Sequence, residues 1–250
     1  HIHSITHNAS GIFFVGSDDG LLEINPVSGE SKPYSNDHTD PGSLSNKFVY
    51  PLMVDHENGL WIGTYFGGVN YLSPNAGKFM SVSISRQTNA QEDIVVSSFA
   101  QDQDGSIWAG SNNGGLFHFD PVSKKIEKRP PHTYNIQSVL RDGNFLWIGT
   151  YSQNLIRLDL RLGTVKEYGY ESGLEDISIY SLYKEGDGTM WAGTSTGLCR
   201  YLPGEDRFEK IKRLAWVSDI ESSADGCLWI SSAKEGILKR NPEGAWEHLD

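Results

Sequence analysis

The stretch Gly59-Leu60-Trp61-Ile62-Gly63-Thr64 decides the fold of this chain, because versions of it recur along the whole sequence. Four copies keep both the Trp and the Gly two positions after it, a fifth keeps the Trp, and the first copy has Phe14 in its place. The six versions lie at residues 12–17, 59–64, 106–111, 145–150, 189–194 and 227–232. Their aromatic residues are 47, 47, 39, 44 and 38 positions apart, and such a period indicates a protein built from structural repeats.

The residues around each copy also repeat. Before the Trp comes an apolar run that ends in an acidic, Gly-containing turn, as in residues 101–105. After it come a short turn, a second apolar run that often ends in Pro, as in residues 115–121, and a fourth short run with an apolar anchor. Runs of about 4–8 β-branched and aromatic residues between Gly, Asp and Asn turns predict four antiparallel strands. Four strands in every repeat predict an all-β fold, a β-propeller of four-stranded antiparallel blades.

We expect a single β-propeller over residues 1–250. The Trp of each repeat should lie on the second strand and pack between blades, and the Gly after it should allow close approach of the backbone. No strand is left over to complete a blade from the other end of the chain, so six blades either close by side-chain packing or belong to a larger or seven-bladed array. The larger array is favoured because no capping segment flanks the repeats. The repeats are expected at approximately residues 1–44, 45–90, 91–132, 133–174, 175–212 and 213–250.

Composition excludes several kinds of protein. With 250 residues, of which 38% are hydrophobic and 21% charged, the chain is folded rather than disordered and can bury a sizeable core. Lys and Arg number 21 against 32 Asp and Glu, a net charge of -11. A nucleic-acid backbone or an anionic membrane attracts a positive field, so we expect neither as a partner. No apolar run approaches the roughly 20 residues of a membrane span, so we expect no direct membrane insertion by this chain.

These repeats resemble the two-component regulator propeller repeat. That pattern is an acidic Gly turn, then Leu-Trp-Ile-Gly-Thr, then Gly-Gly-Leu and an apolar run that ends in Asp-Pro or similar. Residues 42–49, followed eleven positions later by residues 60–64, match it closely, and the resemblance covers essentially the whole chain. It implies the periplasmic sensor region of a hybrid two-component system of the Bacteroides type. There, two seven-bladed propellers precede an immunoglobulin-like domain, a membrane helix, a histidine kinase and a response regulator.

The resemblance also implies a function. It implies a ligand-sensing module that binds a small glycan, has no enzymatic activity in this chain and contacts further blades or domains of the same receptor. Any kinase activity would then belong to a downstream domain, and a homodimer stays open. Two alternatives remain: a scaffold for protein–protein interaction, and a propeller lyase or hydrolase. An enzyme should gather His, Lys, Arg or carboxylates at one opening of the propeller, and no repeat places a clear base beside a clear acid.

The predicted binding residues lie where the repeats differ, in the turns between second and third strands. Tyr65, Phe66 and Tyr151 are aromatic at turn tips, where Gly, Asn or Asp is usually favoured. An aromatic ring stacks on the C–H face of a sugar, and neighbouring amides bond its hydroxyls. The alternative is that these rings fold back onto neighbouring blades. The predicted ligand-binding set is Tyr65, Phe66, Asn112, Asn113, Tyr151, Gln153, Asn154 and Lys234.

Two motifs suggest chemistry that their context argues against. Residues 193–197 match the Gly-x-Ser-x-Gly nucleophile pattern but lie at a strand-to-strand turn rather than a strand-to-helix elbow. The acidic turn at residues 102–105 lacks the Gly and Glu spacing of a calcium loop, and backbone capping explains its carboxylates. We therefore expect no catalytic residue and no cofactor.

The histidines and cysteines give weaker signals. His1 and His3 alternate on a predicted strand, so their rings share a face that can hold a metal, but we expect no metal there. Cys199 and Cys227 lie in adjacent repeats and are interpreted as free, buried thiols. A disulfide between them stays open, because it needs Cα atoms within about 7 Å of each other. The polar insertion at residues 31–45 is either a lid or only a mobile loop.

Overall fold

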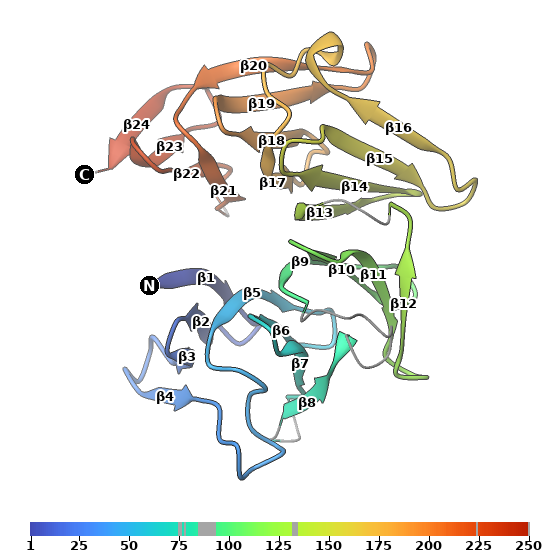
Figure 1. The fold of residues 1–250 in the computed structure, drawn as a ribbon. Helices are drawn as coiled ribbons and strands as arrows, with labels where there is room; N and C mark the ends of the chain where they lie inside the picture. The colour runs from blue at the N-terminus through green and yellow to red at the C-terminus, as the bar shows by residue number, and fades with distance from the viewer. Residues whose placement is uncertain (75–76, 78, 85–93, 132–134, 224, 250) are drawn as a thin grey trace. The chain divides into compact units, whose positions relative to one another are not determined.

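The structure of the chain, a computed structural model, describes residues 1–74, 77, 79–84, 94–131, 135–223 and 225–249. These residues form six four-stranded antiparallel sheets, with strands neighbouring one another in chain order (Figure 1). This confirms the predicted all-β fold of propeller blades. Among the described residues, no helix is long and apolar enough to span a bilayer. The chain divides into two compact units, His1–Tyr134 and Asn135–Asp250, and each unit holds three blades.

The first unit holds blades one to three. The first blade comprises β1 (Ile2–His7), β2 (Phe13–Ser17), β3 (Gly20–Ile24) and β4 (Ser31–Tyr34). The second comprises β5 (Val49–Val54), β6 (Leu60–Thr64), β7 (Gly68–Leu72) and β8 (Phe79–Val82). The third comprises β9 (Val96–Gln101), β10 (Ile107–Ser111), β11 (Gly115–Asp120) and β12 (Lys125–Arg129).

The second unit holds blades four to six. The fourth blade comprises β13 (Ile136–Asp142), β14 (Phe145–Thr150), β15 (Leu155–Asp159) and β16 (Val165–Tyr168), followed by a single 3₁₀ turn, Tyr170–Ser172. The fifth comprises β17 (Ile179–Lys184), β18 (Met190–Thr194), β19 (Gly197–Leu202) and β20 (Arg207–Arg213). The sixth comprises β21 (Val217–Ser222), β22 (Leu228–Ser232), β23 (Gly236–Arg240) and β24 (Trp246–Leu249).

The expected repeat boundaries can be compared with these strands. Those after residues 44 and 174 fall between blades, whereas β20 ends at Arg213, one residue past the expected end of the fifth repeat. The boundaries after residues 90 and 132 lie outside the described residues.

The repeated Trp lies on the second strand, as expected, and it is buried on the second to fifth blades, whereas Trp229 on the sixth is half-buried. Trp61, Trp147 and Trp191 are each no more than 2% exposed. Within each unit the first strand of one blade packs against the first strand of the next: β1 against β5, β5 against β9, β13 against β17 and β17 against β21. The hydrophobic cores therefore lie between consecutive blades, and Trp61, Trp147 and Trp191 belong to them.

The polar turn before the repeated Trp has a structural role in four of the blades. Asp55 accepts hydrogen bonds from the backbone N–H groups of Glu57 and Gly59 at 2.9 and 2.7 Å, and its other oxygen accepts the Trp61 indole N–H at 2.8 Å. The carboxylate thus caps the hairpin and satisfies a buried donor in one step. In the same way the indole N–H groups of three other Trp residues donate to the side chain six positions earlier: Trp108 to Asp102, Trp191 to Glu185 and Trp229 to Ser223.

The Gly two positions after the Trp leaves room for close packing against two first strands, that of its own blade and that of the next blade. A Cβ on Gly193 would lie 2.2 Å from Ser181 Oγ and 2.9 Å from the Val217 carbonyl oxygen. A Cβ on Gly149 would lie 2.3 Å from Ser138 Oγ. No side chain fits at such separations, so the expected close backbone approach is confirmed.

Candidate ligand-binding surface

The antiparallel meander places two kinds of connection at the same end of each blade: the turn between strands two and three, and the segment that leads into strand one. Backbone hydrogen bonds join them, from Tyr65 N to Phe48 O at 3.0 Å and from Trp216 N to Ser195 O at 2.9 Å. We call this end the loop end of a unit. All the predicted ligand-binding residues belong to turns at the loop end.

The first unit carries a row of four aromatic rings at its loop end. His3 stacks on Tyr50 with centroids 4.2 Å apart and planes 10° apart. Tyr50 stacks on Tyr65 at 5.6 Å, and Tyr65 contacts Phe66 at 4.1 Å. Tyr65 is half-buried, so part of its ring packs back onto the protein, as the alternative interpretation of these aromatic residues expected. Phe66 is 50% exposed. We call His3, Tyr50, Tyr65 and Phe66 the first aromatic row.

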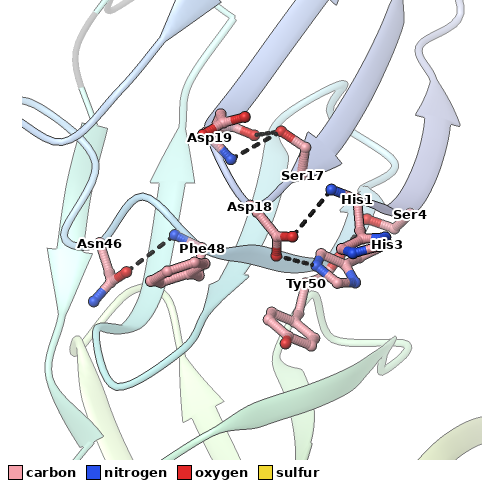
Figure 2. A network of polar contacts seen from close by, with 10 residues as sticks. His1, His3, Ser4, Ser17, Asp18, Asp19, Asn46, Phe48 and Tyr50 are labelled. Carbon is pink, nitrogen blue, oxygen red and sulfur yellow. Dashed lines mark hydrogen bonds and ion pairs between the residues drawn. The ribbon is translucent and has the colours of Figure 1, made fainter.

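Polar contacts hold the start of this row in place (Figure 2). His3 Nε2 lies 2.7 Å from Asp18 Oδ1, on the turn between β2 and β3, and the amino group of His1 lies 3.0 Å from Asp18 Oδ2. The hydrogen bond with His3, and then that with the amino group, lowers the pKa of Asp18. Burial raises the pKa of Tyr50, and the Asp18 carboxylate raises it further. The row thus begins beside a carboxylate that is ionised at neutral pH.

The second unit carries a corresponding row at its own loop end. Tyr151 meets Tyr180 edge to face at 6.3 Å, and Tyr180 packs against Trp216 at 4.9 Å with planes 30° apart. Tyr151 and Trp216 are each 50% exposed. Burial, together with the neighbouring Tyr151 and Asp176, raises the pKa of Tyr180, so its hydroxyl stays protonated and can donate. We call Tyr151, Tyr180 and Trp216 the second aromatic row.

Two of these rings stand on unfavourable backbone. Phe66 has φ 64° and Trp216 has φ 50°, in the left-handed region that favours Gly, Asn and Asp. Of the non-glycine residues with positive φ in the described part of the chain, only these two are aromatic. A bulky side chain there costs about 1–3 kcal/mol, so local turn stability does not explain it. Both are presented to solvent at the loop end, which points to a role in binding.

The predicted polar residues differ in their exposure and in the hydrogen bonds that they make within the protein. Asn113 Oδ1 accepts the Val95 N–H at 3.0 Å, and Asn154 Nδ2 donates to Glu167 at 3.2 Å, so both amides also stabilise local structure. Asn112 is half-buried and donates its backbone N–H to Val95 O. Gln153 and Lys234 are exposed. The structure brings Asn112 and Asn113 to the loop end of the first unit and the other two amides, with Lys234, to that of the second.

Sequence reasoning missed four aromatic residues of these rows. His3, Tyr50 and Tyr180 occupy the same position of strand one in three blades, a column that an alignment of the first strands would have shown. The fourth, Trp216, is one of the two Trp residues outside the repeated column and directly precedes β21. Attention to the turns between strands two and three alone left these positions out.

The remaining motifs have structural explanations. Ser195 lies on the turn between β18 and β19 and donates its hydroxyl to Asp176, so it is not on a strand-to-helix elbow. Cys199 and Cys227 are both buried and unpaired, and burial raises the pKa of Cys199 to about 11. Within the residues that the structure describes, no group of three His, Cys, Asp or Glu side chains could hold a metal ion.

Comparison with known proteins agrees with this architecture. The family model of the two component regulator propeller matches residues 43–66 and 91–113. Histidine kinase P4 of Formosa agariphila is 25% identical over 203 residues, which cover 77% of this chain and 14% of the kinase. The chain therefore spans a small part of that curated relative.

Two solved structures share the fold at low sequence identity. One is the extracellular domain assigned to a hybrid two-component system of B. thetaiotaomicron, 18% identical with a TM-score of 0.83, covering 100% of this chain and 34% of that one. The other is a catalytically inactive virginiamycin B lyase from Staphylococcus aureus with quinupristin, 14% identical with a TM-score of 0.77, covering 99% and 83%. At these identities the likeness shows the fold alone. The chain thus contains two segments that match the two component regulator propeller, in a fold that it shares with an extracellular domain assigned to a hybrid two-component system.

Proposed function

We propose that this chain is a periplasmic ligand-sensing module of a hybrid two-component receptor and that it binds an oligosaccharide at a loop end. The observation that carries the proposal is the placement of Phe66 and Trp216, half-exposed rings on left-handed backbone that turn stability does not favour. Each ends a row of rings whose faces can stack on successive sugars, and Gln153 and Lys234 supply exposed donors at the second loop end. No catalytic step is needed for this role.

The proposal includes partners outside this sequence. The chain covers 14% of the related kinase and 34% of the similar extracellular domain, so we infer that further blades or domains of the same receptor accompany it. On the last blade Ile237 and Leu249, which face each other across β23 and β24, are 50% and 36% exposed. Such apolar surface suits a neighbouring blade. A second copy of the chain would cover it equally well, and sedimentation velocity distinguishes the two.

A thermal-shift screen against neutral and acidic oligosaccharides tests the sensing role. Ligand at about 100 times its Kd adds about 2.7 kcal/mol, which for a chain of this size raises Tm by about 5–11 °C. The shift should be lost in Phe66→Asn or Trp216→Asn, according to which unit holds the site. Lys124→Asn is the matched control, because Lys124 also has positive φ but lies on the turn between β11 and β12, away from the loop end.

Other outcomes of the thermal-shift screen would contradict the proposal or favour an alternative. A shift that survives both aromatic substitutions contradicts binding at the aromatic rows. If no glycan shifts Tm, a protein partner becomes the better explanation of the exposed rings, since Trp and Tyr also dominate protein interfaces. The similar lyase carries no weight for this chain at 14% identity, and turnover of the glycan in the screen would be the finding that favours an enzyme.

A further inference from the structure

A second concave site lies within the first unit, away from its loop end. It is a pocket of about 540 Å³ between the second and third blades, bordered by the turns β5–β6, β9–β10 and β11–β12. In an antiparallel meander these turns lie at the opposite end of the blades from the turns that carry the aromatic rows. The volume falls within the range of about 300–1,000 Å³ that small-molecule sites occupy.

The floor of the pocket is aromatic and rigid. Tyr71 packs on Trp61 with centroids 4.6 Å apart and planes 42° apart. Trp61 is 2% exposed, so the half-buried Tyr71 and Met80 supply the accessible apolar surface. Gly59 makes this arrangement possible, because a Cβ there would lie 2.1 Å from Tyr71 Oη. The ring of Tyr71 therefore lies against the β5–β6 turn in a fixed orientation.

The rim of the pocket is acidic. Three carboxylates line it, Asp55, Glu57 and Asp104, against one lysine, Lys124. Asp55 is already engaged by the Trp61 indole and by two backbone N–H groups. Asp104 Oδ1 accepts the N–H and the hydroxyl of Ser106 at 3.0 and 2.5 Å, and these bonds lower the pKa of Asp104. Asp104 therefore stays ionised at neutral pH, and Glu57 is exposed at the mouth.

These charges act on the aromatic floor. Burial raises the pKa of Tyr71, and the carboxylates of Asp55 and Glu57 raise it further. Their negative potential thus reaches the Tyr71 ring, where a positive charge is also favoured by the ring face. An anion placed there would meet three carboxylates and a single lysine, whereas a cation would find both an aromatic face and acceptors.

We propose that this pocket binds a small organic cation with an apolar body, such as an aromatic primary amine. The apolar part packs on Tyr71 and Met80, and the ammonium group donates to Glu57 and Asp104. The proposal is independent of the glycan site, because none of these residues belongs to either aromatic row. A receptor with both sites would respond to an amine and to a glycan at opposite ends of its blades.

Three probes of one shape and different charge test this: 2-phenylethylamine, 2-phenylethanol and 3-phenylpropionate. Saturation-transfer NMR and calorimetry on the full chain should show binding of the amine and not of the carboxylate. Glu57→Gln should weaken amine binding about tenfold, which is about 1.4 kcal/mol, and Glu57→Lys should abolish it. Both changes leave the fold intact, because Glu57 is exposed. Glu243→Gln, on the exposed turn between β23 and β24, is the matched control and should change nothing.

Every other result overturns the proposal. Equal binding of the amine, the alcohol and the carboxylate would show that the pocket does not select a positive charge. An unchanged affinity for the amine in Glu57→Lys would show the same. Absence of binding by the amine up to about 10 mM, an affinity too weak to be of use, would show that the pocket does not take this class of ligand. Glycan binding at the loop end would be unaffected by any of these outcomes.

Discussion

At the scale of single residues, the indole N–H of the repeated Trp donates a hydrogen bond to the side chain six positions earlier in the chain. The pairing holds for Trp61, Trp108, Trp191 and Trp229. Trp147 departs from it, because the corresponding residue is Arg141, which cannot accept a hydrogen bond. Its Nε1 is buried and has no partner in the described part of the chain.

This difference predicts unequal costs for the same substitution within one unit. Trp191 and Trp147 are both 1% exposed, but only the Trp191 indole is bonded, to Glu185 at 2.7 Å. Trp191→Phe should therefore destabilise the protein by about 1.5–3 kcal/mol more than Trp147→Phe, because it removes a hydrogen bond to a charged acceptor. Urea unfolding of the two variants measures the difference. Equal costs would mean that the indole bond contributes nothing net.

The left-handed aromatics give a second prediction at this scale. Phe66→Asn relieves a strained backbone but loses one ring contact, with Tyr65 at 4.1 Å. We expect stability to stay within about 1 kcal/mol of the parent or to rise, because Asn tolerates positive φ. Thermal unfolding checks this without any ligand. A loss clearly beyond 1 kcal/mol would show that Phe66 is kept for packing rather than for binding.

At the scale of elements, strands one and two of a blade fit together through a small residue facing a Gly. Ser138 lies against Gly149 and Ser181 against Gly193, and on the second blade Pro51 takes the place of the Ser against Gly63. On the sixth blade Ser231 replaces the Gly. The Gly is thus needed only where the strand beside it leaves no room for a Cβ.

A matched pair of alanine substitutions measures this fit. Gly193→Ala forces a Cβ against the backbone oxygen of Val217 and should cost about 1–3 kcal/mol. Gly186→Ala, in the open turn between β17 and β18, meets nothing within 4 Å and should change stability by less than about 0.5 kcal/mol. Chemical denaturation gives both values. A neutral Gly193→Ala would show that β18 can move away from Ser181 on β17 and from Val217 on β21.

A polar hub joins the fourth and fifth blades. Asp206, between β19 and β20, accepts hydrogen bonds from Tyr168 at 2.7 Å, from Tyr201 at 2.5 Å and from Arg157 at 3.2 Å, and it pairs with Lys166. Partial burial works against the charged form. The bonds from Lys166, Tyr168 and Tyr201 outweigh it and hold the pKa of Asp206 well below its usual range.

The sign of this pKa shift sets a pH dependence. A carboxyl whose pKa is lower in the folded state stabilises the protein above its unfolded pKa of about 3.9 and loses that contribution as the pH falls further. Asp206→Asn should therefore be destabilising at pH 7, and its difference from the parent should shrink below about pH 4. Unfolding free energies at several pH values test this. A difference that does not depend on pH would mean that the charge of Asp206 is not what holds the hub.

At the scale of the whole molecule, the chain is two units of three blades, and both cysteines belong to the second unit. Burial raises the pKa of Cys199 to about 11, so about 0.1% of it is thiolate at pH 8. Cys227 lies in the next blade and is also buried. Thiol reactivity therefore reports the opening of the second unit.

Labelling with a thiol reagent across a urea series should show neither cysteine reacting in the folded protein and both becoming reactive together. The physical reason is that the fifth and sixth blades share a core, which includes Trp191, Leu198 and Leu228. Mass spectrometry after labelling counts the modified thiols. A stable singly labelled species would show that these two blades unfold separately.

Much of this protein was determined by its sequence alone. The repeated Trp and Gly, the acidic turns and the short apolar runs are local signals, and each predicts a strand or turn without reference to distant residues. Six such repeats in register predicted the blades correctly. Phe66 and Tyr151 stood out as aromatic residues at turn tips, against turn propensity, but only the structure shows that each ring is 50% exposed.

Only the tertiary structure decided which residues stand together. His3 and Tyr50 are 47 positions apart, and Tyr180 and Trp216 are 36 apart, yet each pair is in ring contact. The pocket beside Tyr71 likewise needs turns from two blades. The residues next to an aromatic residue in the chain are enough to predict the turn on which its ring lies. Its stacking partner is set by how one blade packs on the next, which no local pattern records.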